Sequence, residues 1–215
     1  MQTVTIKEAQ LWYQDADPVH DFDHVLRVYR IAERLSKLEG ADLEIVRAAA
    51  LLHDSRGSAP GVAGSARAEH HITSAQFAGE VLAGKGWPTE RIKAVQHCIL
   101  GHRFRDKENK PQTIEAMVLF DADKLDVLGA IGAARTIAYA ALDGKPAYAE
   151  PSESFLKTGI KEPGELHSSY HEFLFKLRKV KDRLFTDSGK KIAESRHAYL
   201  VGFYAQSQAE VRGER

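Results

Sequence analysis

Apolar residues recur every three or four positions along most of the chain, the spacing that places side chains on one face of an α-helix. The clearest segment is 25–38, where Gly40 follows in the position of a helix C-cap. A shorter segment begins at Asp42, a good N-cap, and ends at His53. The same spacing is found near residues 69–83, 89–101, 112–142, 165–184 and 188–211. The sequence therefore predicts an all-α fold, a helical bundle with no substantial sheet.

Two segments interrupt this pattern. Residues 55–65 and 143–164 are rich in glycine and proline, and the second is expected to form a long exposed loop. Neither is long enough to separate domains, so residues 1–215 are expected to form a single domain. We expect its motif-bearing part near residues 18–142, with C-terminal helices near 165–211 packing on it.

The charge balance limits the kinds of partner. The chain has 30 basic and 30 acidic residues, which argues against binding to nucleic acid polymers or membrane surfaces. The one cysteine, Cys98, allows no intramolecular disulfide and no thiolate metal cage. No signal peptide and no run of roughly 18 apolar residues is found. We expect a cytoplasmic protein, and the charge balance leaves a small anionic substrate and a homodimer open.

Histidine and aspartate residues interrupt several of the apolar helical segments. His24 lies in the first long segment, the pair His53-Asp54 ends the apolar run 48–52, and Asp123 lies within the apolar segment 112–142. Polar groups buried in this way need partners, and a divalent cation can provide them. Imidazoles together with carboxylates suit Mn, Fe, Co, Ni or Zn better than Ca or Mg. The sequence therefore predicts a metal site in the bundle core.

The aspartate that completes this site has to be chosen from three. Asp121 and Asp123 are two residues apart, so on a helix they point about 200° apart and only one can face the ion. The apolar positions of the helix favour Asp123, and Asp121→Asn is expected to cost little metal or activity. Asp126 shares a face with Asp123 and is expected to support the site or lie on the surface.

These segments, in this order, resemble the HD-domain metal-dependent phosphohydrolases. The likeness rests on residues 20–28, 48–54, 121–135 and 176–197, the last two being similar to a subgroup of small bacterial single-domain members. The resemblance implies a metal bound by His24, His53, Asp54 and Asp123. It also implies hydrolysis of a nucleotide, a nucleoside triphosphate giving monophosphate and pyrophosphate, by a metal-activated water. Manganese is favoured, with Co, Ni, Fe, Zn or Mg as other choices.

Further residues are expected to act around the ion. Asp54 is placed to accept a proton from the water, and the other candidates are His102 and Lys124 as catalytic groups and Arg27, His71 and Arg103 as substrate contacts. His20 either orients a ligand or caps its helix. Relatives with two metals carry extra histidines, which His70, His71, His97 and His102 loosely resemble, but one ion is favoured over two. Gly57 stands where some relatives with 5'-nucleotidase activity have a glutamate.

Other functions remain open at this stage. Within the class, the alternatives are hydrolysis of a nucleoside monophosphate or of a cyclic nucleotide. Outside it, they are an HD-type diiron oxygenase and a metal-bearing sensor module without turnover. Two irons per chain would favour the oxygenase, and the absence of turnover on phosphorylated metabolites would favour the sensor.

Overall fold

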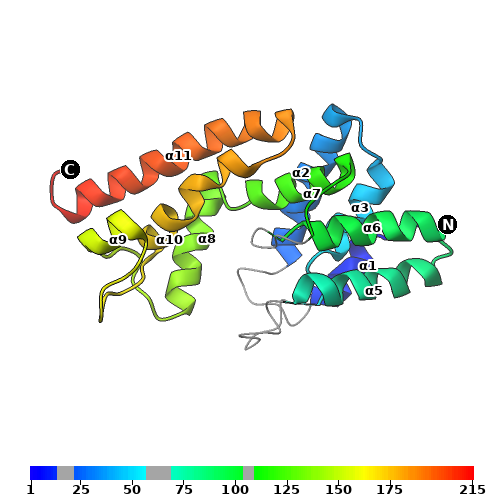
Figure 1. Cartoon of the computed structure of the whole chain (residues 1–215), viewed down its shortest axis with the longest axis horizontal. Coiled ribbons are helices and arrows are strands. Elements are labelled where there is room, and N and C mark those ends of the chain that lie inside the picture. The colour runs from blue at the N-terminus through cyan, green and yellow to red at the C-terminus, as the bar shows by residue number, and fades with distance from the viewer. Residues whose placement is uncertain (14–21, 57–68, 104–108) are drawn as a thin grey trace. The chain divides into compact units, whose positions relative to one another are not determined.

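The computed structural model describes residues 1–13, 22–56, 69–103 and 109–215 (Figure 1). This part of the chain consists of helices, turns and connecting segments and has no strand, which confirms the all-α prediction. It divides into two compact units. Unit 1 comprises Met1–Asp123 and Leu184–Gly189, and unit 2 comprises Lys124–Arg183 and Lys190–Arg215. These are compact parts of one chain, and the expectation of a single domain stays a prediction.

Unit 1 contains the helices that carry the predicted site. They are α1 (Ile6–Gln10), η1 (Leu11–Tyr13), α2 (Phe22–Glu39), α3 (Leu43–Leu52), α5 (His70–Gly84), α6 (Thr89–Gly101) and most of α7 (Ile114–Leu125). Helix α3 packs against both α2 and α6, and α5 packs along α6 (Figure 1). Seven of the ten residues of α3 are buried. Because α3 is covered by neighbouring helices, the residues directly after it start in the interior of unit 1.

The ends of α2 and α3 follow from local chemistry. Gly40 has a φ of 71°, a left-handed conformation that glycine adopts without strain and that ends α2. The Asp42 side chain accepts hydrogen bonds from the backbone N–H groups of Glu44 and Ile45, at 3.0 and 3.2 Å. Both predicted caps are therefore confirmed. The Asp42 carboxylate also accepts two hydrogen bonds from the Arg91 guanidinium of α6, at 2.8 and 3.0 Å.

Asp42→Ala is expected to lower the free energy of unfolding by roughly 1–2 kcal/mol at neutral pH, because it removes a helix cap. Hydrogen bonds from Arg91 lower the pKa of Asp42 in the folded protein. The contribution of the charged carboxylate should therefore be complete above about pH 4 and decline as the pH falls towards the folded-state pKa. Urea denaturation at several pH values measures this. A cost that grows in acid would contradict it, and Asp42→Asn, which keeps an oxygen acceptor, is the matched control.

The N-terminal residues form helices that the sequence pattern did not predict. Ala9 and Tyr13 are buried with Val25 and Leu51 in one apolar cluster. The Tyr13 hydroxyl donates to the carbonyl of Leu51 at 3.1 Å. Residues far apart in sequence therefore meet around the C-terminal half of α3 and fix the position of its end.

Unit 2 corrects three predictions. Its helices are α8 (Gly129–Leu142), α9 (Glu153–Thr158), α10 (Ser169–Phe175), the short η2 (Leu177–Lys179) and η3 (Lys181–Arg183), and most of α11 (Asp187–Val211). The helix predicted over 112–142 is broken before Gly129, which has a φ of 73°. The segment 165–184 is helical only in part, because Ser168 caps α10 and Lys176 leaves the helical conformation with a φ of −123°.

The exposed loop predicted over residues 143–164 is correct only in part, because this segment contains α9 and is held by Glu165. The Glu165 carboxylate accepts hydrogen bonds from the backbone N–H and hydroxyl of Ser152 at 2.8 and 2.7 Å, and from the N–H of Glu162 at 2.7 Å. It also pairs with the buried His171 imidazole at 3.0 Å. These contacts order a segment whose composition alone indicates a loop.

No single helix in the described part of the chain is both long enough and apolar enough to cross a membrane. Helices α7 and α8 meet that length and composition only when taken together across the bend that separates them.

Candidate metal centre

Three elements of unit 1 bring the predicted ligands together. His24 lies in α2, His53 is the C-cap of α3 with Asp54 directly after it, and Asp123 lies in the last turn of α7. The exposed fractions of His24, His53 and Asp123 are 2%, 0% and 8%. Three buried polar side chains and the partly exposed Asp54 thus meet here, and the buried ones need partners within the protein.

The first of two groups consists of His24, His53 and Asp123, whose candidate ligand atoms all lie within 4.8 Å of one another. The His24 Nε2 atom is 3.5 Å from Asp123 Oδ1. The Asp54 Oδ2 atom faces this group, 3.6 Å from His53 Nε2 and 3.9 Å from His24 Nε2. The four predicted ligands therefore converge on one place.

The second group consists of Asp54, His70 and His102. The Asp54 Oδ1 atom is 3.3 Å from His70 Nε2 and 3.4 Å from His102 Nε2, and these two nitrogens are 3.3 Å apart. Asp54 therefore turns one carboxylate oxygen towards each group. It is the residue that joins the two sets of imidazoles.

The orientation of two imidazoles indicates whether a cation fits between these side chains. The Nδ1 atom of His53 lies 2.8 Å from the carbonyl oxygen of Ala50, and that of His102 lies 2.5 Å from the carbonyl oxygen of Ile99. A carbonyl can only accept, so each Nδ1 carries a hydrogen and each neutral ring has its lone pair on Nε2. His53 Nε2 has no hydrogen-bond partner in the described part of the chain. Buried lone pairs facing a carboxylate suit a bound cation, so the residues fit a metal ion.

The charges of the site also favour a bound metal ion. Burial raises the pKa of Asp54, but the imidazoles of His53, His102 and His70 outweigh burial and hold that pKa well below its usual range. Burial lowers the pKa of His102 to about 4, although Asp54 opposes this. At neutral pH the site then offers an ionised carboxylate and a neutral imidazole, the forms that bind metal ions.

The structure distinguishes the two aspartates of α7. Asp123 lies beside His24, whereas the Asp121 carboxylate accepts hydrogen bonds from the segment that contains Phe185 and Thr186. The predicted register of this helix therefore matches the geometry, and ligation by Asp123 stays a prediction. Asp126 is buried and accepts a hydrogen bond from Arg135 at 2.6 Å in unit 2.

The remaining predicted residues lie in several places. Arg27 is partly exposed on α2, one turn after His24, Lys124 follows Asp123 in α7, Arg103 follows His102, and His71 is buried next to His70. His97 accepts a hydrogen bond from the backbone of Gln112 at 3.1 Å and belongs to neither group. His20 and Gly57 lie outside the described residues.

His70 was expected only as one of four histidines that loosely resemble the ligands of a second ion. The pair His70-His71 was visible, but His71 was chosen as the substrate contact, whereas His70 belongs to the second group. His70 begins α5, and Glu69 at the N-cap makes no side-chain capping bond. Because no strong capping signal marks the start of this helix, the two imidazoles could not be told apart from the sequence.

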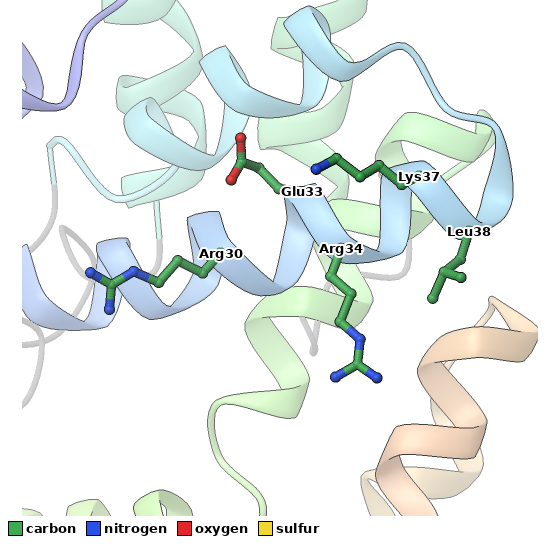
Figure 2. Close-up of a pocket in the computed structure, with 5 residues that line it drawn as sticks. All are labelled: Arg30, Glu33, Arg34, Lys37 and Leu38. Atoms are coloured by element: carbon green, nitrogen blue, oxygen red, sulfur yellow. The ribbon is translucent and has the colours of Figure 1, made fainter.

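A separate hollow of about 370 Å³ lies on α2 (Figure 2). Its lining side chains all come from that helix and are Arg30, Glu33, Arg34, Lys37 and Leu38. None of them is a predicted site residue, and Glu33 is paired with Arg47 of α3. His24 lies on the buried side of the same helix. The hollow is therefore a surface feature apart from the two groups.

Comparison with known proteins shows the family to which the chain belongs. Residues 21–128 match the family model described as HD domain. The Bacillus subtilis protein YpgQ is 30% identical over 96% of this chain and 94% of its own length. A crystal structure of YpgQ in complex with ADP has a TM-score of 0.73 at 28% identity, and the match covers 97% of this chain and 99% of that one. An HD-superfamily hydrolase from Bacillus thuringiensis has a TM-score of 0.69 at 31% identity, over 96% of this chain and 94% of that one.

The buried histidine and aspartate centre on an all-α scaffold, together with these matches, defines the class: a metal-dependent phosphohydrolase. The chain belongs to the HD-domain family.

Proposed function

We propose that this phosphohydrolase acts on nucleotides and cleaves a nucleoside triphosphate to the monophosphate and pyrophosphate. The observation that carries the nucleotide assignment is the ADP complex of YpgQ, whose fold matches this chain over nearly its full length. The bond proposed to break follows from the resemblance of residues 121–135 and 176–197 to a subgroup with this activity.

We propose that His24, His53, Asp54 and Asp123 hold one divalent ion, with manganese preferred. Such an ion, when bound, lowers the pKa of a coordinated water and neutralises charge on phosphoryl oxygens. The protein groups orient the reaction around it. Asp54 stays ionised and can accept a proton from the water, while the buried rings of His24 and His53 exclude bulk solvent.

The role proposed for His102 follows from its hydrogen bonding. Because its Nδ1–H donates to Ile99, the neutral ring has no hydrogen on Nε2 to give to a phosphoryl oxygen. We therefore propose that His102 accepts a hydrogen bond at Nε2, beside Asp54 Oδ1, rather than donating one to phosphate. The cationic contacts to the phosphoryl oxygens are then proposed to come from Lys124, Arg27 and Arg103, with His71 as a further substrate contact.

One observation favours a second ion as the alternative to a single one. The three facing atoms of the second group form a nearly equilateral triangle with edges of 3.3 to 3.4 Å. Imidazole nitrogens and a carboxylate oxygen this close together could hold a second ion, with Asp54, His70 and His102 as its ligands. The alternative predicts two ions per chain rather than one.

The substrate assignment is tested with a nucleotide panel in the presence of Mn²⁺, with phosphate and pyrophosphate measured separately. Nucleoside triphosphates should give monophosphate and pyrophosphate in equal amounts, whereas diphosphates should react slowly because they lack that leaving group. Phosphate released from monophosphates, or opening of cyclic nucleotides, would favour the alternative reactions instead. An Asp54→Ala preparation, purified identically, controls for contaminating phosphatases.

A further inference from the structure

The side chain of Asp123 is buried, but its backbone lies at the end of a helix, where few helical hydrogen bonds hold it. It lies in the last turn of α7, which ends at Leu125. The final carbonyl groups of a helix have no partner within the helix, and last turns fray unless other groups hold them. A metal ligand in this turn therefore depends on whatever fixes the end of α7.

The first such group is Asp121, one turn ahead of the end. Its side chain is fully buried. One oxygen accepts a hydrogen bond from the backbone N–H of Phe185 at 2.9 Å, and the other accepts from the N–H and hydroxyl of Thr186 at 2.8 and 2.6 Å. Hydrogen bonds to an ionised acceptor are stronger than neutral ones. Asp121 thus joins α7 to the segment Leu184–Gly189 within unit 1.

Gly189 shows how closely this segment is fitted to Asp121. A Cβ atom at position 189 would lie 2.4 Å from Asp121 Oδ2 and 2.7 Å from Thr186 Oγ1, closer than real Cβ contacts. The Gly189 N–H donates to Thr186 Oγ1 at 3.0 Å. The absence of a side chain at 189 therefore leaves the space that the carboxylate and the hydroxyl share.

A second group holds the last residue of α7. In unit 2, the Arg196 guanidinium of α11 donates to the carbonyl of Leu125 at 2.6 Å. A basic side chain at a helix C-terminus satisfies an otherwise unpaired carbonyl and favours the negative end of the helix. Within unit 1, the turn that contains Asp123 is thus held by Asp121, two residues before it.

We propose that Asp121 and Thr186 are positioning residues that hold Asp123 in the geometry required for metal binding. This inference rests on the proposed function, since it takes Asp123 to be a ligand. It changes the expectation that Asp121 is dispensable. A change at Thr186 or Gly189, neither of which belongs to the two groups, should weaken metal binding through the last turn of α7.

The test measures the affinity of the metal-free full-length protein for Mn²⁺ and Co²⁺ by competition with a coloured chelator. Thr186→Val removes the hydroxyl and keeps the shape of the side chain, while Thr186→Ser keeps the hydroxyl. Gly189→Ala displaces the Asp121 carboxylate without removing any hydrogen-bonding group. Ser36→Ala is the matched control, because it removes a buried hydroxyl that donates to Ala32 within α2, at 2.8 Å. All variants are compared at a temperature where circular dichroism shows them folded.

Thr186→Val and Gly189→Ala should each weaken metal binding roughly ten- to a hundredfold, as loss of a group that orients a ligand does. Thr186→Ser and Ser36→Ala should stay within about threefold of wild type, within the scatter expected of context-dependent effects. The visible spectrum of bound Co²⁺ should change in the first pair and not in the second.

A purely structural role would lower the melting temperature of Thr186→Val and Gly189→Ala while leaving the affinity and the Co²⁺ spectrum unchanged, and that result would overturn the inference. Asp123→Asn separates this from failure of the proposed site. If Asp123→Asn retains wild-type affinity, the ligand assignment is wrong. If it loses the metal while Thr186→Val and Gly189→Ala do not, the ligand assignment stands and the positioning role is wrong.

Discussion

Asp54→Ala is expected to abolish hydrolysis while the helical fold persists. Asp54 is the residue whose two oxygens face both groups, at 3.6 Å from His53 Nε2 on one side and 3.3 Å from His70 Nε2 on the other. Removing it takes away a proposed ligand and the proposed proton acceptor in one step. We expect the rate to fall at least a hundredfold, about 2.7 kcal/mol in barrier terms. His53→Ala should have a similar effect, since it removes the ring whose Nε2 faces the same place.

Steady-state hydrolysis together with circular dichroism measures this. His97→Ala is a suitable control, because His97 is a partly buried imidazole in α6 that belongs to neither group. It should keep most of the activity. If Asp54→Ala or His53→Ala retained more than about a tenth of the wild-type rate, a loss of only about 1.4 kcal/mol, the proposed site would be wrong.

Removal of the metal is expected to have an effect of comparable size. Protein stripped with a chelator should be inactive, and Mn²⁺ or Co²⁺ should restore turnover, because a mixed shell of imidazoles and carboxylates suits these ions. Metal analysis of the restored protein should find one ion per chain. His70→Ala should leave that number unchanged, since His70 is not among the four proposed ligands.

A different number of metal ions per chain would support another site or another function. Two ions in the wild type and one in His70→Ala would establish the second group as a second metal site. Two irons per chain with activity that requires oxygen would favour the oxygenase. Undiminished turnover in excess chelator, after metal analysis has verified removal, would exclude a metal-dependent reaction at this site.

The parts of the fold that could be predicted from sequence are those set by local chemistry. Gly40 and Asp42 mark the end of one helix and the start of the next because a left-handed glycine and an N-capping carboxylate act on adjacent residues. The doublet His53-Asp54 was recognisable because two polar residues follow an apolar helix that has to be buried. Asp123 was preferred to Asp121 on helical phase and on the family resemblance, and it lies beside His24.

The parts that could not be predicted depend on contacts between distant segments. The role of Asp121 is invisible in sequence, because its partners Phe185 and Thr186 lie more than sixty residues away. The order of residues 143–164 depends on Glu165 and His171, beyond the segment itself. The choice of His70 over His71 depends on where α5 begins, which no strong local signal marks.

The positions of His53 and His102 have a consequence for the order of binding. Each is the C-cap of its helix, α3 or α6, so two helices end at the same place. The C-terminal end of a helix carries about half a negative elementary charge from its aligned peptide dipoles. Together with Asp54 and Asp123, these dipoles give the metal-free centre a potential that attracts a cation and repels the phosphates of a nucleotide. The ion should therefore bind first, and a nucleotide should bind tightly only to the metal-loaded protein.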